Sequence, residues 1–353
     1  MERHRNIYKL AFIISHTSVY TELFKSLLIL STITLIFSVL QGCSKHPQDS
    51  DFTEAANRTS VKLAVRPSQN TEIHSLDALI FNNDMLQRLD CYQRIDNWSE
   101  GTHLIGSCSG NKILLLCANL KIERDQWRQY NSFRKTGTIL SELENEEREF
   151  PVMTSCTYIK AGDEASINLE RLSSEIALRS ISCNFSGKPY KGETITDAKA
   201  YLINVNACSN IIPQENVPIE RIINHGGLIE ADIDLFQDKS LILCELGTIN
   251  STTKFTPCKF ICYPNTHSEE SIGSPFTRLV IEGKIQGETW YWPIDINREK
   301  GGKGIERNRR YIFDINILGK GTKDPNNSIT QDMSDIQFVA EKWEEKESYY
   351  VAF

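Results

Sequence analysis

Short runs of β-branched and aromatic residues recur along most of the chain, with Gly, Pro, Asn and Asp between them. Such runs predict β-strands, because these side chains fit a pleated surface and the separating residues favour turns. Strands are expected at residues 61–65, 75–82, 111–120, 178–185, 198–206, 240–246, 259–265, 277–285, 288–296, 309–319 and 335–343.

Several of these runs alternate between apolar and polar residues. In the expected strand 309–319, Tyr311 and Phe313 fall on one face, while Asp314 and Asn316 fall on the other. This alternation is typical of an antiparallel sheet with one buried and one solvated face. The runs form two clusters, so we predict an all-β fold with minor α content, built as two tandem immunoglobulin-like antiparallel β-sandwich domains.

We place the domain boundary near residue 186, in the stretch "SGKPYKGE", between a sandwich at 61–186 and a sandwich at 187–353. The strand at 178–185 could close the first sandwich or open the second. One segment, 122–150, departs from the β pattern because it is charged and helix-prone. It predicts one or two short helices inserted in the first sandwich.

The start of the chain resembles an export signal. The apolar run 27–40 is shorter than the roughly 20 residues that span a membrane, and it has the length of a signal-peptide core. It ends at Leu40-Gln41-Gly42-Cys43, which resembles a bacterial lipobox. We therefore expect a lipoprotein signal peptide at 1–42 and a lipid on the Cys43 sulfur. A chance cysteine after a transmembrane helix is the alternative.

The residues that follow Cys43 are polar and show no apolar period, so 43–60 is expected to be a flexible tether. Acyl chains contribute about 0.8 kcal/mol per buried CH₂, so a lipidated Cys43 would anchor the chain firmly. This predicts a lipid-anchored protein of the cell outer membrane.

Charge and cysteine content narrow the alternatives further. The formal net charge is −7, and no stretch is basic enough to indicate nucleic acid as a partner. The chain has 10 cysteines, so an odd number remains if Cys43 is lipidated. Because many lie in apolar, strand-like runs, we expect mostly unpaired buried thiols. These are Cys117, Cys183, Cys208, Cys244 and Cys262.

Motifs for catalysis or cofactor binding are weak. Cys108 lies in a G-x-C-x-G pattern, but a nucleophile elbow needs a helix after the turn, and here a strand follows, so we expect a hairpin turn. Cys258 and Cys262 have the spacing of a metal pair without a second pair of ligands. No cofactor, metal or catalytic residue is therefore predicted. The chain is expected not to be an enzyme.

A series of segments resembles the FimB/fimbrillin-type fimbrial subunits and anchor lipoproteins of Bacteroidales type V pili. The segments that carry the resemblance are "SLDALIFNND" (75–84), "GNKILLLCANL" (110–120), "FPVMTS" (150–155), "LERLSSEIALRSI" (169–181), "AYLINV" (200–205), "FICYPN" (260–265), "TRLVIEG" (277–283), "WYWPIDI" (290–296) and "IERNRRYIFDINILGKGTKDP" (305–325), with the lipobox in front.

The resemblance implies two transthyretin-like β-sandwich domains and other fimbrial subunits as partners, joined by exchange of a strand. In stalk subunits of such pili, an Arg-specific protease removes the N-terminal strand. "VKLAVR" (61–66) is the candidate strand here, with cleavage at Arg66 or at Arg58. The alternative, which we favour for an anchored subunit, is that 61–65 is a permanent first strand. The C-terminal segment could donate a strand or close the second sandwich.

The predicted function is a non-enzymatic structural component of a cell-surface fimbrium, an anchor or minor subunit that supports adhesion. A surface glycan-binding lipoprotein is the alternative, and it requires exposed aromatic rings among Trp127, Trp290 and Trp292. A surface hydrolase with Cys108 as its nucleophile is a third possibility.

Overall fold

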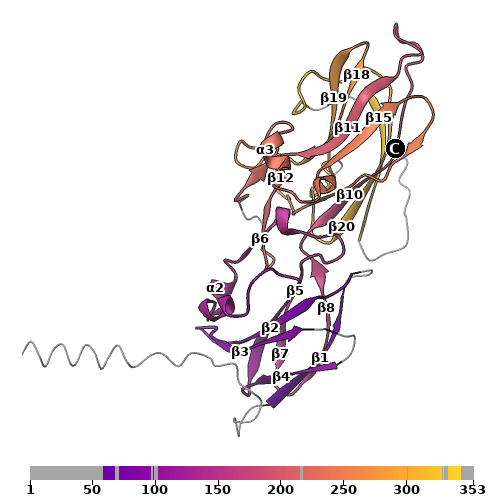
Figure 1. The fold of residues 1–353 in the computed structure, drawn as a ribbon. Helices are drawn as coiled ribbons and strands as arrows, with labels where there is room; N and C mark the ends of the chain where they lie inside the picture. Colours follow the sequence, from indigo (N-terminus) through magenta and orange to yellow (C-terminus); the bar gives the residue numbers. More distant parts are fainter. Residues whose placement is uncertain are drawn as a thin grey trace, which may run out of the picture. The chain divides into compact units, whose positions relative to one another are not determined.

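The computed structural model describes residues 59–67, 71–96, 98, 102–214, 218–299, 301–327, 329 and 333–342. Within these ranges, no helix has the length and apolar character needed to cross a lipid bilayer. Strands account for most of the regular structure, and the few helices are one turn long (Figure 1). The prediction of an all-β fold with minor α content is confirmed.

Two sheets from the N-terminal half face each other. One has the strand order β3 (Leu89–Asp96), β2 (Ser75–Asn82), β5 (Asn111–Ala118), β7 (Met153–Lys160) and β9 (Glu170–Arg171). The other has the order β4 (Thr102–Ser107), β1 (Thr59–Arg66) and β8 (Glu164–Asn168).

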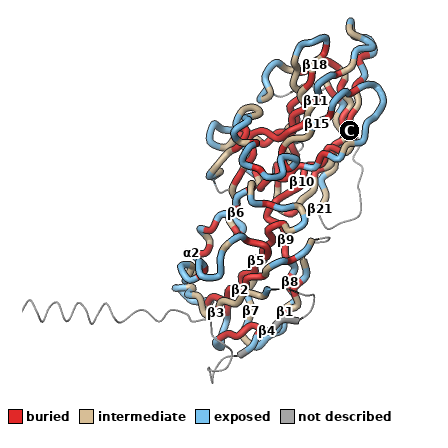
Figure 2. The backbone as a smooth tube through the Cα atoms, in the orientation of Figure 1, coloured by how far each residue is buried: buried red, intermediate tan, exposed pale blue. Residues whose placement is uncertain are grey.

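β5 shows why the central strands of this half are apolar at consecutive positions in the sequence. Leu114 and Leu116 pack in the cluster that contains the side chains of β1, whereas Ile113 and Leu115 belong to a second cluster on the opposite face of the sheet. A strand covered on both faces loses the apolar–polar alternation and becomes a continuous hydrophobic run. Figure 2 shows the resulting buried backbone through β2 and β5.

The predicted insert between β5 and β7 contains short helices, as expected. These are the 3₁₀ helices η1 (Gln126–Gln129) and η2 (Leu143–Asn145) and the α-helix α2 (Phe133–Thr136). The Ser132 side chain caps α2 by accepting from the Lys135 N–H. The insert also holds a strand, β6 (Leu140–Glu142), which pairs with β13 (Cys208–Asn210). A strand of three residues is too short to show a period, so the sequence did not reveal it.

The C-terminal half forms a second pair of sheets. One has the order β16 (Lys254–Phe255), β10 (Ser174–Cys183), β20 (Arg309–Ile317) and β21 (Ser334–Lys342), with β17 (Lys259–Cys262) also on β10. The other has the order β15 (Leu243–Ile249), β11 (Ile195–Ile203), β18 (Arg278–Ile285) and β19 (Glu288–Asp295).

Shorter elements connect these strands. They are β12 (Val205–Asn206), which pairs with β14 (Ile222–Ile223), the α-helix α3 (Glu230–Ile233) and the 3₁₀ helix η3 (Lys239–Leu241). The predicted strand 240–246 therefore begins with a helical turn, and its extended part is β15.

Strand partners settle the position of the strand predicted at 178–185. The corresponding β10 pairs with β16, β17 and β20, all of which come later in the chain. It therefore opens the second pair of sheets. The alternation predicted for β20 is also confirmed, because Tyr311 and Phe313 are each 1% exposed, whereas Asp314 and Asn316 on the other face remain partly exposed.

Most strand pairs are antiparallel, and two of the described pairs are parallel. β1 runs parallel to β8, and β10 runs parallel to β20. Parallel neighbours need a long connection, and each of these pairs is separated by several intervening strands. The alternation of side chains is the same in both kinds of pair, so the sequence did not distinguish them.

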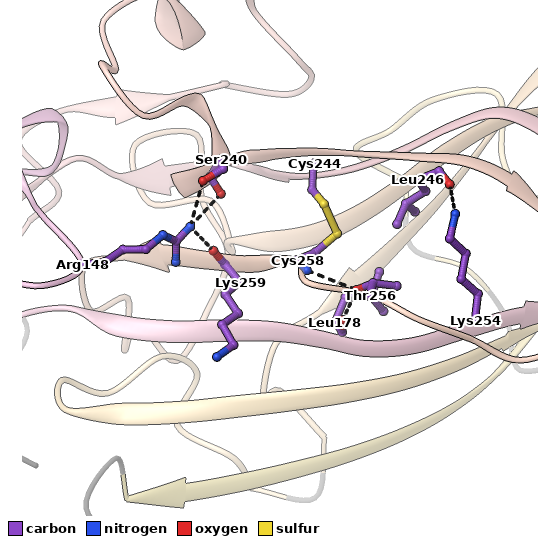
Figure 3. Close-up of a disulfide and its surroundings, with 9 residues drawn as sticks. All are labelled: Arg148, Leu178, Ser240, Cys244, Leu246, Lys254, Thr256, Cys258 and Lys259. Carbon is purple, nitrogen blue, oxygen red and sulfur yellow. Dashed lines mark hydrogen bonds between the residues drawn. A yellow bond between two sulfur atoms is a disulfide. The ribbon is translucent and has the colours of Figure 1, made fainter. Parts of the chain in front are cut away.

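One disulfide connects the two sheets of the second pair (Figure 3). It joins Cys244 in β15 to Cys258, the residue before β17. The prediction that Cys244 is an unpaired thiol is therefore wrong, because the two sheets bring it to a cysteine 14 residues away. Cys258 is equally excluded as half of a metal pair with Cys262. Cys117, Cys183, Cys208 and Cys262 are unpaired, as expected.

Candidate subunit-assembly site

The strand β1, which contains the candidate "VKLAVR" segment, is the central strand of its sheet. Residues 59–64 pair antiparallel with β4, and residues 62–66 pair parallel with β8. β1 therefore forms backbone hydrogen bonds along both of its edges. Its removal would leave two strands that have no pairing with each other.

Alternate side chains of β1 fill the space between the first two sheets. Val61 and Leu63 are 0% exposed, and Val65 is 1% exposed. They pack with Ile105 of β4 and Ile167 of β8, among other buried residues. Burying an aliphatic side chain of this size stabilises a fold by roughly 1.5–3 kcal/mol, so these three residues contribute strongly to the attachment of β1.

The outward face of β1 is polar. The Lys62 ammonium lies 2.6 Å from Oε1 of Glu164 in β8. This hydrogen bond raises the pKa of Lys62 and lowers the pKa of Glu164. Both groups are exposed, and exposed ion pairs contribute little to stability. Recognition of β1 by its neighbours therefore depends on main-chain hydrogen bonds and the buried row.

This geometry can support exchange of a strand. A chain without β1 would present the unpaired edges of β4 and β8 and a row of apolar pockets between them. A strand with apolar residues at alternate positions would satisfy both, which is the physical basis of β-augmentation. Strand exchange at this site needs no catalytic residue, because it depends on backbone hydrogen bonds and the packing of aliphatic side chains.

Arg66, one predicted cleavage site, lies at the exposed end of β1. Its carbonyl oxygen accepts a hydrogen bond of 2.9 Å from the Leu169 N–H. The next residue is Pro67, whose ring replaces the N–H and restricts the backbone after the bond that a protease would cut. Both features oppose cleavage after Arg66. Arg58 and the predicted lipid site Cys43 lie outside the described residues.

The C-terminal strand β21 pairs with β20 along its whole length, from Ser334 opposite Ile317 to Lys342 opposite Arg309. In this structure it forms one edge of a sheet in the second pair. Of the two roles considered for the C-terminal segment, residues 334–342 therefore have the closing role.

Cys108 does not occupy a nucleophile elbow. It is exposed and lies between β4 and β5, which belong to different sheets, so the predicted hairpin turn is wrong as well. Its backbone N–H donates to Oδ2 of Asp90 at 2.8 Å. Across the described residues, no group of three or more His, Cys, Asp or Glu side chains could hold a metal ion.

The three tryptophans named for glycan binding do not form an exposed platform. Trp127 is 1% exposed, and Trp292 is 0% exposed with its Nε1 donating to the Gly319 carbonyl at 3.0 Å. Trp290 is partly exposed, but the Lys323 ammonium lies 3.5 Å from the centre of its ring. A lysine on the ring face competes with sugar stacking, so the structure does not favour this alternative.

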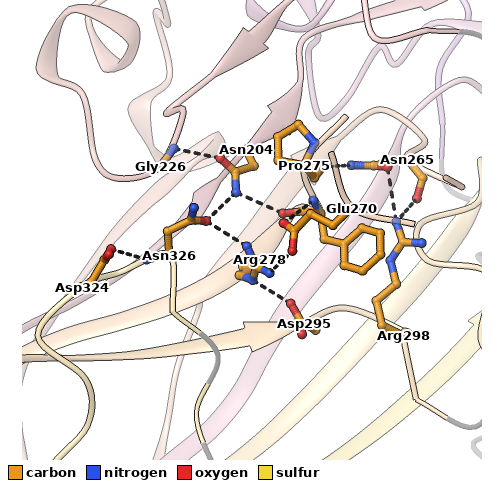
Figure 4. Close-up of polar contacts among 11 residues, drawn as sticks. Asn204, Gly226, Asn265, Glu270, Pro275, Arg278, Asp295, Arg298, Asp324 and Asn326 are labelled. Carbon is orange, nitrogen blue, oxygen red and sulfur yellow. Dashed lines mark hydrogen bonds and ion pairs between the residues drawn. The ribbon is translucent and has the colours of Figure 1, made fainter. Parts of the chain in front are cut away.

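A polar network holds the loops around β18 (Figure 4). The buried Arg278 donates to Asp295 at 2.7 Å, to Asn326 at 2.8 Å and to Glu270 at 2.7 Å. Burial would raise the pKa of Glu270, but hydrogen bonds from Arg278 and from the Phe276 N–H outweigh it and lower the pKa. Each of these charged groups has a partner, so the network acts as a structural support for the loops.

Sequence reasoning missed the two strands that hold β1. β4 and β8 contain few large apolar residues. Among their side chains that the structure describes, Ile105 and Ile167 are the large apolar ones that are buried. In β8 the alternation of Ala165 and Ile167 with polar residues was the available signal. It is weak because it extends over five residues.

No protein-family model and no curated protein matches the sequence. Solved structures do match. A Bacteroides eggerthii protein assigned to cell adhesion is 14% identical, with a TM-score of 0.62 over 81% of this chain and 96% of that chain. A fimbrilin from Porphyromonas gingivalis is 16% identical, with a TM-score of 0.59 over 81% of this chain and 97% of that chain.

The tip fimbrial protein of Porphyromonas gingivalis, in a form with a C-terminal truncation, is 11% identical, with a TM-score of 0.53 over 81% of this chain and 100% of that chain. This chain has the fold of these Bacteroidales fimbrial and cell-adhesion proteins. The resemblance noted in the sequence is confirmed at the level of the fold.

Proposed function

We propose that this protein is a non-enzymatic structural component of a cell-surface fimbrium, in the position of an anchor or minor subunit. The observation that carries the proposal is the central position of β1, with both edges paired and Val61, Leu63 and Val65 buried. The fold supports it, because the matching structures include a fimbrilin and a tip fimbrial protein.

The partners are other fimbrial subunits, and assembly proceeds by strand exchange. The slot between β4 and β8 is the receiving site in a subunit that has lost its first strand. In this chain β1 fills that slot, and the hydrogen bond to the Arg66 carbonyl and the following Pro67 favour its retention. A subunit with its own slot filled contributes by donating a strand or by ending the polymer, which suits an anchor.

The anchor itself is a lipid on Cys43, which places the protein in the cell outer membrane. The proposed organisation is a signal peptide at 1–42, a tether from Cys43 to the start of β1, and two sandwiches. The boundary between the sandwiches lies before β10 rather than at residue 186, because β10 pairs with later strands. The charge and polar character of 43–60 allow the tether to extend away from the membrane surface. This arrangement keeps β1 joined to the lipid, whereas cleavage after Arg66 would release the folded body.

The first experiment is mass spectrometry of the N-terminus of the protein isolated from cells. An acylated Cys43 at the N-terminus is the expected result, and Cys43→Ala should then remain unprocessed. A matched control, Cys156→Ala, replaces an exposed cysteine in β7 and should be processed normally.

A free N-terminus at residue 59 or 67 would contradict the anchor role and indicate a polymerising subunit instead. The fimbrial role is tested separately by shearing fimbriae from the cells. Absence of the protein both from the sheared fimbriae and from their attachment sites would overturn that role.

A further inference from the structure

A buried lysine lies between a carboxamide and a carboxylate at one end of the first sandwich. The Nζ atom of Lys112 is 2.6 Å from Oδ1 of Asn82 and 3.0 Å from Oδ2 of Asp90. The Lys112 side chain is 2% exposed, and the Asp90 side chain is 7% exposed. Neither the fold comparison nor the strand-exchange site accounts for this cluster.

The strand register brings the three residues together. Asn82 at the end of β2 lies directly opposite Lys112 in β5. In β3, Leu89 pairs with Phe81 and Cys91 pairs with Ile80, so Asp90 is the extra residue of a β-bulge. A bulge re-aims a side chain that would otherwise alternate regularly, and here it places the Asp90 carboxylate beside the lysine of the next strand but one.

The Lys112 side chain has apolar neighbours on one side and a path to solvent on the other. Ile80 and Leu114, the next pair on the same face of the sheet, are both 0% exposed. A buried ammonium needs polar partners in such a place, and Lys112 has both Asn82 and Asp90 within hydrogen-bond distance. Asn82 is only partly buried, so a small molecule released at its side chain could reach the solvent.

Hydrogen bonds hold the Asp90 carboxylate in place beside Lys112. Its Oδ2 accepts hydrogen bonds from the Ser107 hydroxyl at 2.9 Å and from the Cys108 N–H at 2.8 Å. Burial would raise the pKa of Asp90, but these donors, the Cys108 thiol and Lys112 together lower it. The carboxylate is therefore ionised and fixed in orientation next to the lysine.

We propose that Lys112 and Asn82 form an intramolecular isopeptide bond, with Asp90 as the proton carrier. Asp90 takes a proton from the Lys112 ammonium, and the free amine attacks Cγ of Asn82. A new C–N bond forms and the bond from Cγ to Nδ2 breaks. The departing nitrogen takes one proton from the attacking nitrogen and a second from Asp90. One ammonium ion leaves, Asp90 returns to its ionised form, and no oxidant or co-reactant is needed.

The consequence is a covalent link between β2 and β5, the two central strands of their sheet. Both strands line the core that β1 fills, so the link would hold this sheet together while β1 is bound or absent. The inference stands independently of the proposed fimbrial function, because it rests only on the three side chains and their surroundings.

Intact mass measurement of the purified full chain under denaturing conditions tests the proposal. The expected mass is lower than that of the sequence by one ammonia molecule, after correction for the disulfide. Because succinimide formation at an asparagine also releases ammonia, a tryptic map is required. It should show the peptide with Asn82 joined to a peptide that remains uncut after Lys112.

Matched variants complete the test. Lys112→Arg and Asp90→Asn should each have the full mass of their sequences, whereas Lys62→Arg, at an exposed lysine, should still lack one ammonia molecule. A wild-type chain of full mass would overturn the proposal, whether or not the variants fold. Loss of water with a link between Lys112 and Asp90 would overturn it too, because the bond would then involve a different acceptor.

Discussion

The hydroxyl of Tyr263 donates a hydrogen bond of 3.1 Å to Oε1 of Glu146, and both residues are buried. Glu146 follows the one-turn helix η2 of the insert, and Tyr263 follows β17 in the second pair of sheets. The carboxyl also accepts from the Val152 N–H at 3.2 Å. A buried acid therefore connects the two halves of the described chain.

This acid makes stability depend on pH. Burial raises the pKa of Glu146 from 4.5 to about 7, against smaller opposite effects of the Val152 N–H, Tyr263, Arg171 and Lys121. The folded state thus holds the proton more tightly than the unfolded state. The stabilising contribution is present below pH 4.5 and is lost as the pH rises to about 7.

We expect the free energy of unfolding of Glu146→Gln, relative to wild type, to increase between pH 5 and pH 8 by an amount on the order of 3 kcal/mol. The side-chain amide of the variant is neutral throughout this pH range, so its stability does not change with the titration of this position. Urea unfolding at several pH values measures the difference, with Glu147→Gln at the neighbouring exposed acid as the control. A constant difference across this range would show that Glu146 keeps an ordinary pKa.

The disulfide between Cys244 and Cys258 closes a segment with a sequence separation of 14. A cross-link over a loop of this length stabilises a protein by about 3 kcal/mol in the chain-entropy description. The double variant Cys244→Ala, Cys258→Ala should lose about that much in denaturant unfolding. Cys156→Ala should unfold like wild type because it keeps the disulfide. A reductant should destabilise wild type and Cys156→Ala but not the double variant.

The stability of the β1 attachment should depend on its buried side chains, Val61, Leu63 and Val65. Leu63→Ala removes a side chain that is 0% exposed and should lower the free energy of unfolding by about 3 kcal/mol. Lys62→Ala on the outward face should leave the free energy of unfolding nearly unchanged, because its ion pair with Glu164 is exposed. Equal effects of the two changes would mean that β1 is not packed as described.

Gly321 allows a close approach of two backbone segments. A Cβ atom at this position would lie 2.0 Å from the Tyr291 carbonyl oxygen, where Thr322 pairs with Tyr291 through two backbone hydrogen bonds. Gly321→Ala should therefore lower the free energy of unfolding by about 3 kcal/mol.

Gly273 provides the control for this change. A Cβ atom there has no neighbour within 4 Å, so Gly273→Ala should alter stability by less than about 0.5 kcal/mol. Thermal unfolding of both variants measures the difference in stability. If Gly321→Ala were as stable as wild type, the loop at 321 could move away from β19.

The strands with the clearest composition were predictable from local pattern. β2 was predicted at its observed bounds, and the alternation in β20 correctly separated its buried and exposed faces. The short helices between β5 and β7 followed from the charged, helix-prone segment. These features depend on neighbours within a few residues, and this is the range over which side-chain period and backbone propensity act.

The candidate site was predictable only in part. The sequence indicated that 61–65 is an apolar strand, and it offered Arg66 as a point of cleavage. It did not show that β1 lies between β4 and β8, because those strands carry few apolar residues and come about 40 and 100 residues later in the chain.

The sequence by itself therefore determined the class of the fold, the clearest of its strands and the resemblance to fimbrial subunits, since these follow from composition and short-range pattern. The tertiary structure alone decided the parallel pairing of β1 with β8, the bond between Cys244 and Cys258, and the meeting of Lys112 with Asn82 and Asp90. Each of these joins segments whose contact depends on strand register and bulges, and a one-residue change in register would have turned every side chain to the other face.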